Sequence, residues 1–191
     1  MRISGVEEDC RRCPITGFSP PVWATRTKIV LSQGDPSSKV FFVGDAPNRE
    51  EDAEGTPLVG KVGEVFDSLL SSIGLDRQKV YVTNLIKCRP ANPQDGDRAP
   101  TCNEVRICLP HVLTEIREVQ PKIICPLGSL ALSCFLPRFV RLSDVHGKPH
   151  RYGDKTLIPL YHPTSALTKP ELLETMKADM LTVKKAAEEV G

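Results

Sequence analysis

Four cysteines have the residue type and the spacing of a metal site. Cys10 and Cys13 form a Cys-x-x-Cys pair near the start of the chain, and Cys88 and Cys108 follow in its middle. Four thiolates suit either zinc or a cubane 4Fe-4S cluster, and the spacing alone does not separate the two. Cys102 is a spare thiol that could compete for the fourth position. Such a site would tie the N-terminal segment to the core.

Three further segments carry side chains that could act on a ligand. Residues 44–48 read GDAPN, in which Gly44 and Pro47 suit a sharp turn and Asp45 could orient a water molecule. Asn84 and His162 each follow a run of strand-forming residues. A histidine there could donate a hydrogen bond to an oxygen that develops negative charge. The alternatives are an acidic solvated loop, an asparagine that caps a turn and a structural histidine.

The amide of Asn84 has a donor and an acceptor in one plane. Uracil needs this pair, because its N3–H requires an acceptor and its O4 requires a donor. Cytosine presents the opposite pattern at both positions. A fixed asparagine would therefore discriminate between the two bases.

Short apolar runs alternate with helical patterns, and this arrangement must position the polar segments. Strands are predicted at 39–43, 79–86, 122–127 and 156–160, and helices at 63–73, 103–119, 128–136 and 170–189. Residues 45–60 are predicted to be a long polar loop. Alternating strands and helices favour a mostly parallel sheet covered on both faces. Ligands of such sheets bind beyond the carboxyl ends of the strands, where the three polar segments fall.

The composition is that of an ordinary globular domain, with 40% hydrophobic and 26% charged residues among 191. We expect one domain over 1–191, with residues 1–38 an irregular segment tied down by the metal. The net charge of +1 excludes a global basic field, so any nucleic acid must bind a local basic face. Seven cysteines without a secretory signal favour a reducing, cytoplasmic location, and Cys125 and Cys134 are expected to be buried thiols. No apolar stretch is long enough for a membrane span.

Taken in order, these segments resemble the family 4 uracil-DNA glycosylases, the iron–sulfur branch of that superfamily. The most specific string is VYVTNLIKCRP at 80–90, which follows the family pattern Val-Tyr-x-Thr-Asn-x-x-Lys-Cys-Arg-Pro. The resemblance extends over about residues 10–180. Its other parts are CRRCP at 10–14, GDAPN at 44–48, GTPLVGKVG at 55–63, CLP at 108–110, PKIICPLG at 121–128 and HP at 162–163.

The resemblance implies a three-layer α/β/α sandwich with a four-stranded sheet, a 4Fe-4S cluster and the excision of uracil from DNA. A glycosylase of this size can work as a monomer, and we expect one. By position, Asn84 would read uracil, His162 would bind its O2, and Asp45 would take the place of the catalytic glutamate. The implied ligands of the cluster are Cys10, Cys13, Cys88 and Cys108. Base-binding positions would also include Gly44, Ala46, Pro47, Asn48 and Leu58, and DNA-binding positions Lys87, Arg89, Ser165 and Leu167, with Leu167 as the wedge that fills the vacated stack.

Three residues depart from the family pattern. Asp45 replaces a glutamate, Asn48 replaces a glycine, and Leu58 replaces the phenylalanine that stacks on the flipped base. Stacking on an aromatic ring is worth about 1–3 kcal/mol per base. Two alternatives therefore stay open: a glycosylase for another deaminated base such as hypoxanthine or xanthine, and a non-catalytic iron–sulfur protein that binds DNA.

Overall fold

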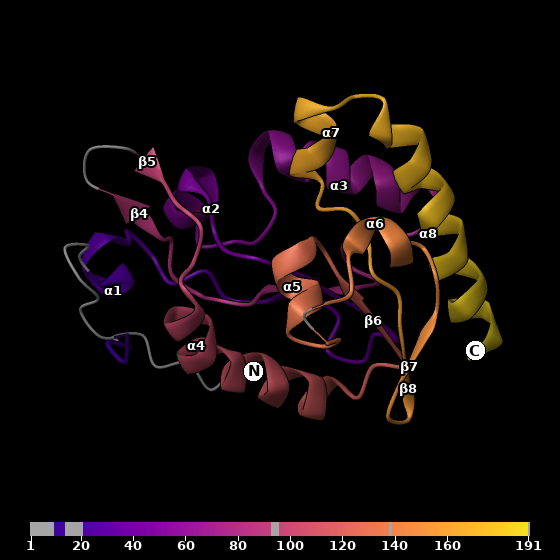
Figure 1. Ribbon diagram of the computed structural model, residues 1–191, viewed down its shortest axis with the longest axis horizontal. Coiled ribbons are helices and arrows are strands. Elements are labelled where there is room, and N and C mark those ends of the chain that lie inside the picture. The colour runs from indigo at the N-terminus through magenta and orange to yellow at the C-terminus, as the bar shows by residue number, and fades with distance from the viewer. Residues whose placement is uncertain (1–9, 14–20, 93–95, 138, 191) are drawn as a thin grey trace.

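A six-stranded mixed sheet forms the centre of the protein (Figure 1). The computed structural model describes residues 10–13, 21–92, 96–137 and 139–190. The strand order is β1-β3-β2-β6-β8-β7. The four inner strands are parallel, and the two edge strands pair antiparallel to their neighbours. The strands are β1 (Gln33–Gly34), β2 (Val40–Gly44), β3 (Tyr81–Asn84), β6 (Ile123–Pro126), β7 (His150–Tyr152) and β8 (Lys155–Leu157).

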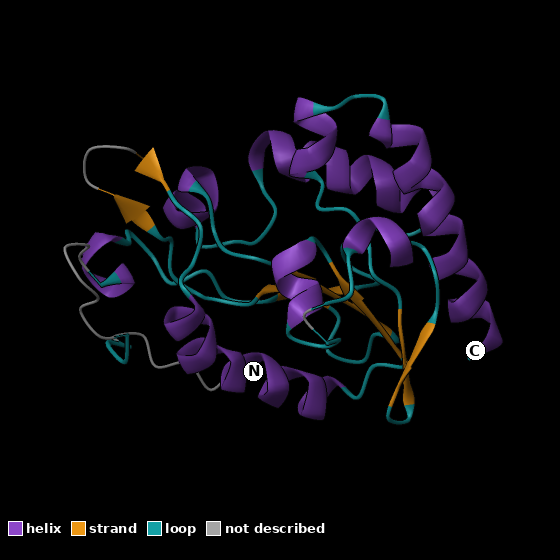
Figure 2. Cartoon of the chain, viewed as in Figure 1, coloured by secondary structure: helices purple, strands orange, loops and turns teal. Residues whose placement is uncertain are grey.

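Helices follow the strands along the chain and cover the sheet, as Figure 2 shows. They are α1 (Val22–Thr25), α2 (Arg49–Glu54), α3 (Gly60–Ser72), α4 (Cys102–Val119), α5 (Ser129–Ser133), α6 (Leu142–Val145), α7 (Thr164–Thr168) and α8 (Leu172–Glu189). A separate hairpin of β4 (Ala91–Asn92) and β5 (Gly96–Asp97) lies beside α1. Within the described residues, no helix is both long and apolar enough to cross a membrane.

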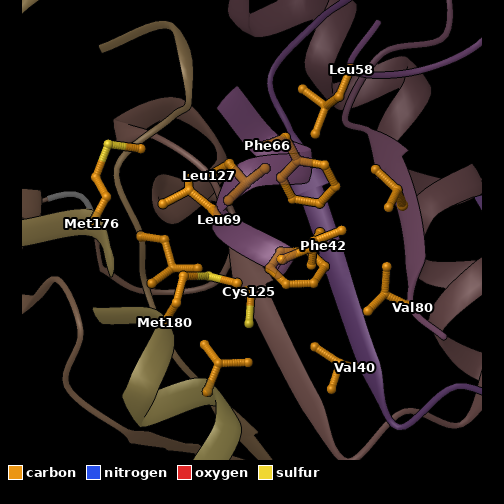
Figure 3. Packing of buried hydrophobic residues seen from close by; sticks show 14 of the residues in the cluster. Val40, Phe42, Leu58, Phe66, Leu69, Val80, Cys125, Leu127, Met176 and Met180 are labelled. Atoms are coloured by element: carbon orange, nitrogen blue, oxygen red, sulfur yellow. The ribbon is translucent and has the colours of Figure 1, made fainter. Parts of the chain in front are cut away.

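Alternation along β2 assigns its side chains to two separate cores. Val40 and Phe42 face a cluster with α3 and α8, where the rings of Phe42 and Phe66 meet edge to face at 5.2 Å between centroids (Figure 3). Phe41 and Val43 face the other cluster, which α4 and α5 cover. Because β2 is buried on both faces, its sequence is continuously apolar rather than alternating.

The predicted four-stranded parallel sheet is confirmed as the inner part of the observed one. The prediction of a loop throughout residues 45–60 is wrong, because α2 forms there. Asn48 caps this helix: its side chain accepts from the Glu51 N–H, and the Glu51 side chain accepts from the Asn48 N–H. This capping box satisfies two otherwise unpaired donors, which stabilises a helix of only six residues.

Parallel pairing places the polar ends of two strands side by side. Gly44, the last residue of β2, is in register with Asn84, the last residue of β3. The β6–β8 side of the sheet adds Gly128, whose N–H donates to the carbonyl of Leu160 at 2.9 Å. The predicted chemical segments therefore meet at one edge of the sheet.

Candidate functional site

Asn84 and His162 approach each other across Gly44. A Cβ atom added to Gly44 would collide with Oδ1 of Asn84 and would lie 3.7 Å from Nε2 of His162. Glycine is therefore required at this position by close approach, although its φ angle is not positive. The structure brings together three residues that the sequence analysis placed in one site.

Asp45 lies on the adjoining wall of the same site. A Cβ atom on Gly128 would be 3.1 Å from Oδ2 of Asp45 and 3.4 Å from Cβ of His162. The other carboxylate oxygen, Oδ1, accepts a hydrogen bond from the N–H of Ala131 in α5 at 2.9 Å. Burial raises the pKa of Asp45 to about 6, against the opposing effect of that hydrogen bond. Its basicity is therefore closer to neutral pH than that of an exposed aspartate.

The carboxylate of Glu51 fixes the orientation of the Asn84 amide. Oε1 of Glu51 accepts from Nδ2 of Asn84 at 3.0 Å and from the N–H of Leu58 at 2.7 Å. Oε2 accepts from the N–H of Asn48 at 2.8 Å. A carboxylate can only accept hydrogen bonds, so Nδ2 must face Glu51 and Oδ1 must face Gly44. Burial raises the pKa of Glu51, although its hydrogen bonds oppose the shift.

The local contacts of His162 assign its tautomer. The N–H of Thr164 donates to Nδ1 at 3.3 Å, and the Thr164 hydroxyl lies 2.9 Å from the same nitrogen. Because Nδ1 accepts a hydrogen bond, the proton of the neutral ring lies on Nε2. Burial lowers the pKa of His162 to about 4. Near neutral pH the ring is therefore uncharged and points an N–H donor toward Gly44.

An open cleft of about 650 Å³ adjoins these groups. Asp45 and His162 form part of its lining, together with Ser165 of α7, which was predicted to bind DNA. Other lining residues come from α5 and from the segment 140–143, which includes the start of α6. The cleft is therefore bordered by both of the loops that follow β6 and β8.

The four predicted cysteine ligands line one small cavity between α4 and the N-terminal segment. Cys10, Cys13, Cys88 and Cys108 all contribute to it, whereas Cys102 is exposed and does not. Among the described residues, no three acidic, histidine or cysteine side chains are close enough to hold a single metal ion. A zinc ion lies about 2.3 Å from each of its sulfur ligands, whereas a polynuclear cluster can bind thiolates that are farther apart from one another. The donor set fits such a cluster.

Side chains of the α1 region hold the cysteine segment in place. Arg26 donates through Nη1 to the carbonyl of Cys10 at 2.6 Å and to Sγ of Cys88 at 3.1 Å. The indole of Trp23 donates to the carbonyl of Cys13 at 2.8 Å. The pKa of Cys13 is raised to about 12, mainly by burial and to a smaller extent by repulsion from the neighbouring thiolates. A metal group must therefore displace protons from these sulfurs when it binds.

The prediction that Lys87 binds DNA is wrong. Its side chain is 1% exposed and forms an ion pair with Glu115 of α4 at 3.0 Å. The side chain of Lys87 points into the protein, where it also donates to the hydroxyl of Thr83 and to the carbonyl of Asn84 at the end of β3. Arg89 is partly buried and is paired with Asp97 of the hairpin at 2.5 Å, so its contact with DNA stays a prediction.

The remaining base-binding predictions fall on the scaffold of the site. Leu58 is 1% exposed, packs in the apolar cluster of α3 and does not line the cleft. Its contact with a base stays a prediction, as do those of Ala46 and Pro47. Asn48 serves as the helix cap described above. Cys125 is fully buried as expected, and Cys134 is partly buried.

Sequence reasoning missed the part that Glu51 plays in the site. The signal was available in the spacing of Asn48 and Glu51, which is that of a capping box. The contact of Glu51 with Asn84 spans 33 residues and has no local signature. Sequence reasoning also missed the place of Gly128 in the site. Its φ angle of 97° explains why glycine occupies the turn beside Asp45.

Comparisons with known proteins agree with this geometry. The model of the uracil DNA glycosylase superfamily matches residues 31–184. The type-4 uracil-DNA glycosylase of Archaeoglobus fulgidus is 36% identical over 178 residues, which cover 89% of this chain and 84% of that protein. The type-4 enzyme of Thermotoga maritima is 35% identical over 164 residues, 85% of this chain and 81% of that protein.

A solved structure supports the fold alone. The crystal structure of Pedobacter heparinus SMUG2 aligns with a TM-score of 0.51 at 11% identity and covers 81% of this chain and 77% of that one. The sequence relatives carry the closer assignment, because their matches include nearly the whole chain at more than 30% identity. The chain belongs to the type-4 uracil-DNA glycosylases of the uracil DNA glycosylase superfamily.

Proposed function

We propose that this protein is a DNA repair glycosylase that hydrolyses the N-glycosidic bond of deoxyuridine, releasing uracil and leaving an abasic site. One observation carries the proposal: Oδ1 of Asn84 and Nε2 of His162 meet across Gly44, with the Asn84 amide oriented by Glu51. The relatives at 32–36% identity are named as type-4 uracil-DNA glycosylases, which supports the same substrate.

The orientation of Asn84 matches the edge of uracil. Oδ1 is free of the Glu51 contact and can accept from N3–H, while the second hydrogen on Nδ2 can donate to O4. Cytosine would place a donor and an acceptor in the opposite order. Because Glu51 accepts from Nδ2, the amide cannot rotate to accommodate cytosine without losing a buried hydrogen bond.

The reaction requires the deoxyuridine to leave the base stack, since C1′ is inaccessible within a duplex. As the bond between C1′ and N1 breaks, its electron pair passes to uracil and the sugar gains oxocarbenium character. The Nε2–H of His162 and the Asn84 amide stabilise the uracil anion by hydrogen bonds that strengthen as charge develops. Asp45 orients a water molecule that attacks C1′. The carboxylate of Asp45 accepts a proton from this water, which leaves the abasic sugar with a new hydroxyl group.

We further propose that Cys10, Cys13, Cys88 and Cys108 hold a 4Fe-4S cluster. The shared cavity of the four thiols supports it. When bound, the cluster supplies a structural cross-link rather than redox chemistry, because the hydrolysis transfers no electrons. The cysteine segment and the loop after β3 would then be fixed to α4.

The first prediction tests the reading of the base. The purified protein is expected to release uracil from a labelled oligonucleotide, and Asn84→Asp to lower kcat by about 10²- to 10³-fold, the usual effect of removing one preorganised donor. The variant also puts a second carboxylate beside Glu51. Binding to uracil-containing DNA, measured in parallel, controls for folding.

Parallel assays with hypoxanthine and xanthine substrates test the alternatives. Preference for one of them over uracil would assign a different base to the pocket. Tight DNA binding with no release of any base would mean that the protein is not a glycosylase. Full uracil release by Asn84→Asp would contradict the role assigned to that amide.

The second prediction concerns pH. The pKa of Asp45, raised to about 6, means that the carboxylate is protonated and inactive as a base below that value and ionised above it. We expect kcat/KM to rise with pH through about 6 and then level off, whereas His162, with a pKa lowered to about 4, stays neutral throughout. Asp45→Asn should be slow and lack this rise. A rise that persists in Asp45→Asn would assign it to Glu51 instead.

The third prediction concerns the side chains that contact DNA. Leu167 on α7 is 43% exposed, and Phe139, 85% exposed, directly precedes the segment 140–143 that lines the cleft. We propose that Leu167 fills the vacated stack and that Phe139 stacks on a neighbouring base. Leu167→Ala should slow release from duplex more than from single-stranded DNA. Phe139→Ala should weaken DNA binding by about 5- to 100-fold, from a stacking energy of about 1–3 kcal/mol.

Leu181→Ala is the matched control for these two variants. Leu181 is 50% exposed on α8 and does not line the cleft. Its replacement should leave both duplex cleavage and DNA affinity unchanged. An equal effect of all three substitutions would show that the cleft does not define the DNA-binding face.

The fourth prediction separates the cysteines. Cys102 and Cys108 lie on the same helix, but only Cys108 lines the shared cavity. Cys108→Ser is expected to reduce bound iron and the visible absorption of the cluster, whereas Cys102→Ser should retain both. Wild-type protein that is colourless and contains stoichiometric zinc would contradict the iron–sulfur proposal. Equal losses in the two variants would contradict the ligand assignment.

A further inference from the structure

Lys87 makes an unusual set of contacts for a lysine. Its side chain is 1% exposed, and that of Glu115, its partner on α4, is 0% exposed. Nζ donates to Oε1 and Oε2 of Glu115 at 3.1 and 3.0 Å, to the carbonyl of Asn84 at 3.0 Å, and to the hydroxyl of Thr83. Acceptors from the protein therefore surround all three N–H groups of the ammonium.

The contact with Asn84 connects this ion pair to the base-binding site. The carbonyl of Asn84 accepts from Lys87, while the side chain of the same residue donates to Glu51. Asn84 is thereby held on its backbone by one buried charge and on its amide by another. The two contacts together fix both the position and the rotation of the amide.

The same lysine contacts the cysteine site. Lys87 lines the same small cavity as Cys108, and the next residue in the chain is Cys88. Cys108 and Glu115 are seven residues apart on α4, which places them on one face two turns apart. Through its bond to Glu115, Lys87 thus connects this face of α4 to the end of β3.

Stability alone does not explain this arrangement. Desolvation of two buried charges offsets most of their attraction, and well-packed apolar side chains of similar volume are often as stable. We propose that Lys87 is a positioning residue for uracil excision: paired with Glu115, it holds the Asn84 carbonyl against the helix that carries Cys108. The proposal rests on the glycosylase function proposed above. It predicts a catalytic loss when the ion pair is replaced without loss of stability.

The informative variant replaces both members of the pair, Lys87→Met with Glu115→Leu. A single substitution would leave one charge buried and unpaired, and would destabilise the protein for that reason alone. Ile116→Val is the control, because Ile116 is a buried neighbour of Glu115 on α4 that does not contact Lys87 or Asn84 through any hydrogen bond. Thermal unfolding, the visible absorption of the cluster, DNA affinity, KM and kcat are measured for each protein.

We expect the double variant to unfold near the wild-type temperature, to keep its cluster absorption and to bind DNA normally. Its kcat should fall by about 10- to 100-fold with little change in KM, because a small displacement of a preorganised group is felt in the transition state. Inhibition by free uracil should weaken in parallel. Ile116→Val should retain the wild-type kcat.

Two results would overturn the proposal. One is an unchanged kcat in a stable double variant, and the other is a fall in kcat that is no larger than the loss of cluster absorption in the same variant. If the double variant does not fold, Lys87→Met with Glu115→Gln removes both charges with a smaller change of shape, and the same outcomes apply. Wild-type protein is assayed first. Failure to release uracil there would count against the proposed function, whereas an unchanged double variant counts against the positioning role alone.

Discussion

The buried carboxylate of Glu51 is the interaction on which the site depends. It accepts hydrogen bonds from Asn48, Leu58 and Asn84, which belong to three separate stretches of chain. A buried carboxylate is costly unless its lone pairs are used, and here both oxygens are engaged. One side chain therefore closes the turn after β2, starts α2 and orients the amide at the end of β3.

The next residue, Asp52, connects the same short helix to the cysteine site. Its carboxylate accepts from the N–H of Thr27 at 2.9 and 2.8 Å, and Arg26 contacts both Cys10 and Cys88. Neighbouring residues of α2 thus bind in two directions, Glu51 toward the base site and Asp52 toward the segment that holds the cysteines. The short helix α2 therefore contacts both the segment that carries Arg26 and the side chain of Asn84.

The inner sheet and the long helices could be predicted because their signals are local. Apolar runs at β2 and β6 and the 3.6-residue pattern of α3 are decided within a few residues. Convergence of Asp45, Asn84 and His162 followed from the rule for carboxyl ends of parallel strands. The burial of Lys87 could not be predicted, because its partner Glu115 lies 28 residues away on α4. A lysine beside a polar loop is usually exposed, and only the fold supplies the acceptors that reverse this expectation.

Two of the three departures from the family pattern, Asn48 and Leu58, donate hydrogen bonds to Glu51. The structure explains the departures at Asn48 and Asp45. Asn48 has an extended backbone with φ of −86°, so glycine is not required, and its side chain caps α2. The shorter Asp45 is held by the N–H of Ala131, which fixes its direction even though it reaches less far. The structure does not explain the third departure, Leu58. Its φ of 51° is unfavourable for any bulky side chain, and this conformation is maintained by a hydrogen bond from its N–H to Glu51 and one from Arg77 to its carbonyl. The backbone of Leu58 is thus constrained by the same carboxylate that orients the Asn84 amide, and this contact uses the Leu58 N–H rather than its side chain.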